Sequence, residues 1–376
     1  MLYEIDKSCL PLLENGQPEY ILFFEELAID RRKCKNLIVA SKEVLESLSK
    51  IGAFSKTVKE IYKILGNRRS EFKLLRNSVK KYCRIVAEGN NEIIENEQGQ
   101  EIIILPLAKA AGADFTEKVI FLAENRDDIK FYKVLGRHYM KSKQIGVINL
   151  EFECQGGGGS TIGGTLGEHI NDEKRFCLCI VDSDRKFEQD SPGNTMRGVS
   201  DVIDGISPVF FETVLLEIHE IENLIPFCIL DKVIKEKKLN EQGLKFLCYL
   251  ITKDSTNTSP ALFFDLKKGI PKKAFFLNAE ATEEQKRKYR KLENFRLYWK
   301  KYIEDFGIIL DENQEEEMIV SGICEKILKD SLEILEEVQQ KGEIGKIVID
   351  PHLKELWEQI GEKIFCWGCV GNRIAV

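Results

Sequence analysis

The chain has 376 residues, of which 43% are hydrophobic and 31% are charged, and its formal net charge at pH 7 is −7. This length allows two or three domains, and this composition is that of a folded globular protein. No apolar stretch reaches the roughly 18 residues that a membrane-spanning helix needs. The acidic net charge does not by itself indicate nucleic-acid binding, although a chain that is acidic overall can still present a basic groove to phosphates.

From the first residues we expect no signal peptide. Residues Met1 to Asp6 lack the basic stretch and the apolar core of a signal peptide. Eleven cysteines in a chain without such a signal favour a reducing compartment. We therefore expect a cytoplasmic protein that has no membrane contact.

Residues 1–112 are expected to form an N-terminal helical domain. Apolar spacing predicts three helices followed by a hairpin, over Val44–Ile51, Lys56–Leu65, Ser70–Val86 and Glu92–Leu105. These are the elements of a winged helix, with the basic stretch Arg68–Arg84 on or near its third helix. A small helical domain with a solvated basic face is the alternative.

Residues 113–240 alternate between strand and helix patterns. Strands are predicted over Val119–Glu124, Ile145–Phe152, Phe176–Val181 and Val209–Leu216, and helices over Asp127–His138, around Leu166 and over Ile221–Lys235. This order predicts an α/β domain, a mostly parallel sheet with helices on both faces. The glycine-rich segment Gly156–Gly164 lets backbone approach a phosphate closely, although a flexible surface loop is an equal alternative.

Residues 241–376 are predicted to be mainly helical. Apolar residues recur at helical spacing from Met318 to Val338. Such a stripe is typical of a core helix or a dimer seam.

Carboxylates follow two of the predicted strands directly. Glu124 ends the first strand, and Asp182 and Asp184 follow the third. Ligands of open α/β sheets bind beyond the carboxyl ends of the strands, and carboxylates gathered there repel one another unless a divalent cation lies between them. Each element has a structural alternative, since Glu124–Asp128 could cap a helix and Asp182–Asp184 could form a turn. Their conjunction favours a metal site.

A glutamate, a glycine-rich loop and then Asp-x-Asp, with the acids at strand ends, resemble the TOPRIM domain of topoisomerases, bacterial primases and OLD-type nucleases. The resemblance covers residues 116–225, and the segment Glu217–Asn223 is similar to a Glu-Asn motif of phage-defence members. It implies catalysis with Mg²⁺ or Mn²⁺. The implied metal ligands and catalytic groups are Glu124, Asp182, Asp184, Glu220, Glu222 and, as a phosphate contact, Lys186. Asn125 departs from the family pattern, in which many members have glycine.

A basic and aromatic stretch lies farther along the chain. Between Lys267 and Lys301 there are twelve Lys and Arg against four Asp and Glu, a local net charge of +8. Side chains expected to contact nucleic acid are Lys286, Arg287, Lys288, Arg290, Lys291, Arg296, Lys300 and Lys301, with interleaved aromatics that could stack on bases. The alternative is a solvated basic helix whose aromatics face the core.

We therefore expect a metal-dependent nuclease acting on DNA or RNA, and the resemblance implies a phage-defence effector. No Walker motif is present, so control by nucleotide hydrolysis would need an ATPase partner. The sequence is also compatible with a homo-oligomer. Three alternatives remain: a DNA-cleaving protein like the topoisomerase VI A subunit, with Tyr62 or Tyr82 as nucleophile; a glycosyltransferase whose Asp-x-Asp holds a nucleotide-sugar diphosphate; and an inactive TOPRIM scaffold.

Overall fold

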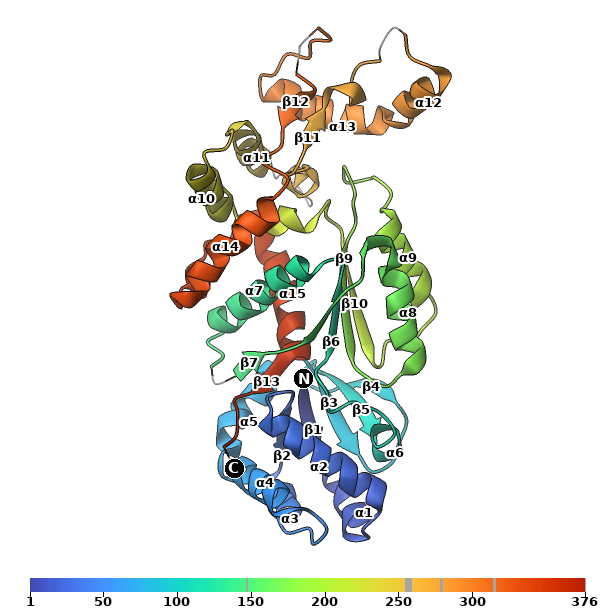
Figure 1. The fold of residues 1–376 in the computed structure, drawn as a ribbon, viewed down its shortest axis with the longest axis vertical. Coiled ribbons are helices and arrows are strands. Elements are labelled where there is room, and N and C mark those ends of the chain that lie inside the picture. The colour runs from blue at the N-terminus through green and yellow to red at the C-terminus, as the bar shows by residue number, and fades with distance from the viewer. Residues whose placement is uncertain (147, 254–258, 278–279, 314–315, 376) are drawn as a thin grey trace. The chain divides into compact units, whose positions relative to one another are not determined.

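The computed structural model describes residues 1–146, 148–253, 259–277, 280–313 and 316–375 (Figure 1). The chain divides into two compact units. Unit 1 comprises Met1–Ile180, Gly198–Val214 and Glu358–Val376, and unit 2 comprises Val181–Arg197 and Leu215–Trp357. The two larger sheets are mostly parallel and are accompanied by helices, which confirms the predicted α/β class.

The units cross the predicted domain boundaries because distant segments meet in unit 1. Lys81 Nζ lies 3.2 Å from an oxygen of Glu212, and the indole of Trp367 donates a 2.6 Å hydrogen bond to the same carboxylate. Arg31 donates a 2.8 Å bond to the carbonyl of Asn372. Residues from the first, middle and last parts of the chain therefore share one core.

The N-terminal part of unit 1 is a five-stranded sheet in the order β2-β1-β3-β5-β4 (Figure 1). The strands are β1 Leu2–Ile5, β2 Leu37–Ala40, β3 Lys81–Val86, β4 Glu92–Glu95 and β5 Glu101–Pro106. The helices are α1 Leu10–Glu14, α2 Pro18–Arg32, α3 Lys42–Leu48, α4 Lys56–Asn67, α5 Arg69–Ser78 and α6 Leu107–Ala110, with the 3₁₀ helix η1 Lys7–Cys9. Ser41 and Ser55 begin α3 and α4, because each side chain accepts a backbone hydrogen bond three residues on.

This sheet differs from the predicted helical or winged-helix domain. Its strands pair in parallel except for β4 and β5, which form the predicted hairpin with Gly99 at a φ of +68°. The third predicted helix ends at Ser78, and Lys81–Val86 is the central strand β3. Tyr82, Cys83 and Ile85 are completely buried there, as suits a strand covered on both faces.

The second sheet has the order β10-β9-β6-β8. Its strands are β6 Ile120–Ala123, β8 Glu153–Gly156, β9 Cys177–Asp182 and β10 Phe211–Leu216, and its helices are α7 Arg126–Ser142, α8 Ile162–Asp172, α9 Asn194–Ile203 and, from the end of the chain, α15 Lys354–Gly368. Strand β6 pairs in parallel with both β8 and β9. Helices α7 and α15 lie on one side of the sheet, and α8 and α9 lie on the other (Figure 1).

The predicted second strand, Ile145–Phe152, was misplaced. Its middle forms the short strand β7 Ile148–Leu150, which pairs antiparallel with β13 Cys369–Gly371 in a separate small sheet. The strand beside β6 is instead β8, which runs into the glycine-rich segment. Strand β8 lies at the edge of the sheet and its residues are mostly exposed, so it lacks the apolar run from which strands were predicted.

Unit 2 is mainly helical, and it contains residues 241–357 of the region 241–376 that was predicted to be mainly helical. Its helices are α10 Phe227–Lys237, α11 Gln242–Thr252, α12 Glu283–Lys291, α13 Glu293–Asp305 and α14 Ile327–Gln340. Shorter elements are η3 Ile221–Leu224, η4 Pro260–Phe263, β11 Gly269–Pro271, η5 Lys272–Ala274, β12 Met318–Ser321, η6 Ile344–Lys346 and η7 Pro351–Leu353. Rings of Phe246, Phe264 and Trp299 pack together in its core.

Two predicted helices of unit 2 are interrupted. The helix expected over Ile221–Lys235 splits into η3 and α10 at Pro226, because proline lacks the N–H that a continuous helix needs. The apolar stripe from Met318 begins as strand β12, which pairs with β11, before α14 starts at Ile327.

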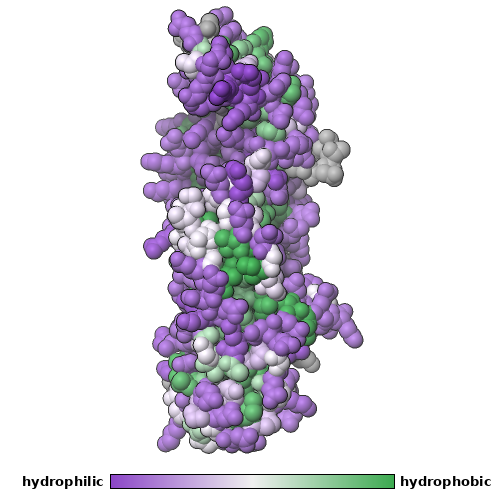
Figure 2. Space-filling view, turned by 90° about the vertical axis from the view of Figure 1, so that its right-hand side faces the viewer, coloured by the Kyte–Doolittle hydropathy of each residue, from purple (hydrophilic) through white to green (hydrophobic). Residues whose placement is uncertain are grey.

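None of the described helices is both long and apolar enough to cross a bilayer. The face of the molecule seen in Figure 2 is mainly hydrophilic.

Candidate metal centre

The segment after β9 leaves the sheet in a fixed conformation. Ser183 donates its backbone N–H to the carbonyl of Ile218 at 3.1 Å, and Asp184 donates to the carbonyl of His219 at 2.8 Å. Asp184 has a left-handed φ of +55°, which aspartate tolerates better than most residues. The Asp-x-Asp pair is thereby bound to the segment that follows β10.

Gly193 makes room for one of these carboxylates. Its N–H donates a 2.7 Å bond to the carbonyl of Ser183. A Cβ at Gly193 would lie only 2.2 Å from Oδ2 of Asp184. The absence of a side chain here is therefore what lets Asp184 keep its place.

The two predicted glutamates lie on the segment that holds the Asp-x-Asp pair. Oδ2 of Asp182 accepts a 2.8 Å bond from the N–H of Ile221, which lies between Glu220 and Glu222. Asn223 fixes this segment from the other side, because its amide donates to two backbone carbonyls at 2.9 and 2.8 Å. Unit 2 therefore brings together Asp182, Asp184, Glu220 and Glu222.

Sequence reasoning missed three members of this cluster. Lys267 Nζ lies 2.8 Å from Oε2 of Glu220 and 3.3 Å from Oε1 of Glu222. His219 Nε2 lies 3.8 Å from Oδ2 of Asp265. His219, Glu220 and Asp265 each place one ligand atom within 4.8 Å of the others. Residues more than forty positions apart meet here, and no local pattern marks them.

Burial and neighbouring charges shift the pKa values of three groups in this cluster. Burial is the largest influence on His219 and lowers its pKa, but the neighbouring carboxylates of Asp265, Glu220 and Asp184 together raise the pKa above its usual value. Burial raises the pKa of Glu222 despite the neighbouring Lys267. Burial opposes charge on Lys267, but Glu222 and Glu220 raise its pKa. The cluster is thus an acidic centre in which the ammonium of Lys267 contacts two of the carboxylates.

Glu124 lies in unit 1, directly after β6, and is half-buried. The alternative that the segment Glu124–Asp128 caps a helix is confirmed in part, because Asn125 and Asp128 form the capping box of α7, whereas Glu124 is not part of that box. The glycine-rich loop adjoins it: Gly157 donates to the carbonyl of Ala123 at 2.7 Å, and Gly158 to that of Glu124 at 3.2 Å. The meeting of Glu124 with Asp182 and Asp184 stays a prediction, since they belong to different units.

The predicted phosphate contact, Lys186, is exposed two residues after Asp184. Its carbonyl accepts a 2.9 Å hydrogen bond from the indole of Trp299 on α13, and the rings of Phe187 and Tyr298 lie 5.8 Å apart. The basic helix α13 is therefore attached to the loop that follows the Asp-x-Asp pair.

Most of the predicted nucleic-acid contacts on α12 and α13 face solvent. The exposed side chains are Arg287, Lys288, Arg290, Lys291, Lys300 and Lys301, while Lys286 and Arg296 are partly covered. Phe295 and Trp299 are buried, so these two aromatics pack in the core and cannot stack on bases. Some charges are shared with neighbours, because Lys286 pairs with Glu283 and Lys288 with Glu284.

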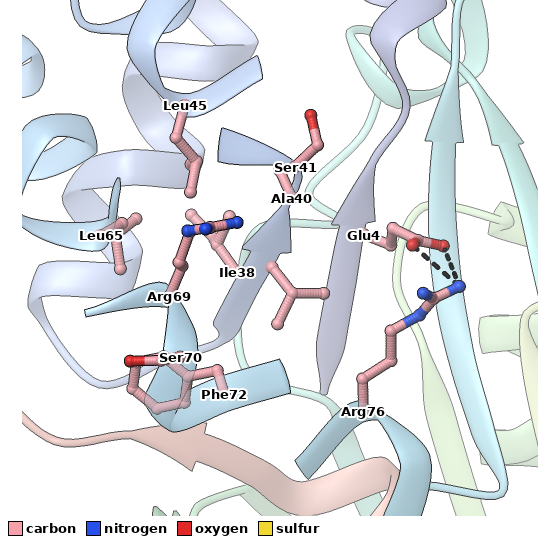
Figure 3. Close-up of a pocket in the computed structure, with 11 residues that line it drawn as sticks. Glu4, Ile38, Ala40, Ser41, Leu45, Leu65, Arg69, Ser70, Phe72 and Arg76 are labelled. Atoms are coloured by element: carbon pink, nitrogen blue, oxygen red, sulfur yellow. Dashed lines mark hydrogen bonds and ion pairs between the residues drawn. The ribbon is translucent and has the colours of Figure 1, made fainter. Parts of the chain in front are cut away.

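Several side chains of the second basic stretch, Arg68–Arg84, are paired with carboxylates, since Arg68 contacts Glu71 and Lys81 contacts Glu101 and Glu212. Arg76 and Arg84 both pair with Glu4, at 3.0 and 2.7 Å. Glu4 and Arg76 line a cavity of about 330 Å³ in unit 1, whose apolar wall includes Phe72 and whose rim includes Arg69 (Figure 3). This cavity has no part in the acidic centre.

The two candidate tyrosine nucleophiles are completely buried. The hydroxyl of Tyr62 donates a 2.8 Å bond to the carbonyl of Phe24, and burial raises its pKa. The hydroxyl of Tyr82 accepts bonds from Arg76 and Arg84. Neither is placed to attack a phosphate from outside.

Comparison of the chain with protein-family models, with curated proteins and with solved structures found no match.

Proposed function

We propose that this chain is a nuclease of the TOPRIM type that hydrolyses phosphodiester bonds of DNA or RNA with Mg²⁺ or Mn²⁺. The observation that carries the proposal is the acidic centre of unit 2, in which Asp182 and Asp184 are hydrogen-bonded to the segment of Glu220 and Glu222. The proposal adds Glu124, because it follows β6, the parallel neighbour of β9 in the sheet.

The donor set suits a hard divalent cation. Magnesium takes oxygen ligands, and the centre offers the carboxylates of Asp182 and Asp184, while Glu220 and Glu222 contact the ammonium of Lys267. Oε2 of Glu222 is buried and has no hydrogen-bond partner among the described residues. When bound, the ion would supply a more acidic water and charge neutralisation on the reacting phosphate.

The protein's own residues have distinct tasks in this scheme. Asp182 and Asp184 would hold the cation, and the absence of a side chain at Gly193 leaves room for the Asp184 carboxylate. Glu124 is a further ligand or takes the proton of the attacking water. Lys186 contacts a phosphate, and the exposed basic side chains of α12 and α13 bind the nucleic-acid backbone.

The proposed function also implies a cellular role. We propose a cytoplasmic effector of phage defence, for which an ATPase partner provides any nucleotide-driven control. The buried tyrosines do not favour the topoisomerase alternative.

Cleavage assays on duplex and single-stranded DNA and on RNA test the proposal. The wild-type protein should cleave at least one substrate with Mg²⁺ or Mn²⁺ and should lose activity in excess EDTA. Asp182→Asn retains an oxygen that can accept from Ile221, so the variant should fold, yet it should lose at least about 100-fold in rate. Glu124→Gln should behave alike. Full activity in either variant, or in EDTA, would refute the proposal.

A further inference from the structure

Two of the predicted metal ligands, Glu220 and Glu222, contact the positively charged side chain of Lys267. The ammonium of Lys267 lies 2.8 Å from Glu220 and 3.3 Å from Glu222. Glu222 is only 7% exposed in its side chain, so this pair of contacts is shielded from solvent. A buried carboxylate needs such a partner, because an isolated buried charge is strongly unfavourable.

The backbone fixes Lys267 in this position. Oδ1 of Asp265 accepts bonds from the N–H groups of Lys267 and Lys268, at 3.0 and 2.8 Å. A Cβ at Gly322 would lie 2.6 Å from the backbone of Lys267. The backbone at Gly322, directly after strand β12, therefore packs against the backbone of Lys267. The ammonium is therefore a built part of the centre and not a mobile surface charge.

We propose that Lys267 takes the place of a second metal ion, so that the centre binds a single divalent cation, through Asp182 and Asp184. The inference rests on the proposed function for that one cation. Paired ions in two-metal sites lie roughly 3.5–4 Å apart. A second ion on Glu220 and Glu222 would compete with the ammonium for the same oxygens and would be repelled by it.

Removing the ammonium should open a second site. Glu220 and Glu222 would lose their counter-charge, and His219 and Asp265 already place ligand atoms within 4.8 Å of one from Glu220. Nδ1 of His219 is buried and has no hydrogen-bond partner among the described residues. Lys267→Gln keeps much of the side-chain length while removing its charge.

Titration of the full chain with Mn²⁺, with free ion counted by electron paramagnetic resonance, tests the inference. We expect one Mn²⁺ per wild-type chain and two per chain of Lys267→Gln. The matched control is Lys268→Gln, since Lys268 is exposed and touches the same Asp265 only through its backbone. That control should bind one.

The outcomes separate the inference from the function on which it rests. Two ions in the wild type, or one in a folded Lys267→Gln, would overturn the inference and leave the nuclease proposal standing. No ion in the wild type would refute the proposed function itself. Should Lys267→Gln fail to fold, Glu222→Gln in the wild-type background decides: an unchanged count and affinity supports the inference, and a tenfold loss of affinity overturns it.

Discussion

The indole Nε1 of Trp299 donates a 2.9 Å hydrogen bond to the carbonyl oxygen of Lys186. This bond attaches helix α13, with its exposed lysines and arginines, to the loop that begins at Asp184. A phosphate backbone bound along α12 and α13 would therefore be held next to the carboxylates of unit 2.

Charge reversal on the basic helices should weaken nucleic-acid binding. In the variant Lys288→Glu, Arg290→Glu and Lys291→Glu, each lost phosphate contact should reduce the slope of log affinity against log salt by roughly one unit. Fluorescence anisotropy over a salt series measures this slope. A control with the same charge change on α3 and α4, at Lys42, Lys56 and Lys63, should bind like the wild type. Equal effects in both variants would mean that only net charge matters.

A methyl group at Gly193 should disturb the centre without unfolding the protein. In Gly193→Ala the new Cβ would lie 2.2 Å from Oδ2 of Asp184, so this carboxylate must move. We expect Mn²⁺ affinity to fall at least tenfold, as measured by calorimetry. Gly164→Ala is the matched control, because a Cβ there meets nothing within 4 Å and alanine favours the helix. Wild-type affinity in Gly193→Ala would argue against Asp184 as a ligand.

The acids at strand ends could be predicted from sequence, while their partners could not. Apolar runs that end in Glu124 and Asp182 mark buried parallel strands, and both strands lie in one sheet. Lys267 and Asp265 were not predicted as members of the centre, because they are more than forty residues from Glu220 in the sequence and come close to it only in the folded chain. The strand Leu2–Ile5 was not predicted, because four residues are too few to show the two-residue alternation of a strand.

A buried ion cluster makes the stability of unit 1 depend on pH. Burial alone would raise the pKa of Glu212, but Lys81 and Lys363 hold it below its usual value. A lowered carboxylate pKa gives stability that is full above the unfolded pKa of about 4.5 and is lost as the pH falls through the folded pKa. Glu212→Gln should cost about 3 kcal/mol at pH 7, and the difference from wild type should shrink in acid.

Denaturant unfolding at several pH values checks this prediction. Glu101→Gln is the control, since Glu101 pairs with the same Lys81 at 3.0 Å but is 53% exposed. An exposed pair contributes about 1 kcal/mol or less. Equal losses in the two variants, or a difference for Glu212→Gln that persists in acid, would contradict the prediction.

The position of a bound ion tests the central claim most directly. Anomalous scattering from a crystal of the full chain soaked in Mn²⁺ should show one ion per chain, bound by Asp182 and Asp184 and approached by Glu124. A metal-bound structure in which the ion lies away from Asp182 and Asp184, or in which Glu124 contacts that ion neither directly nor through a bound water, would contradict the account.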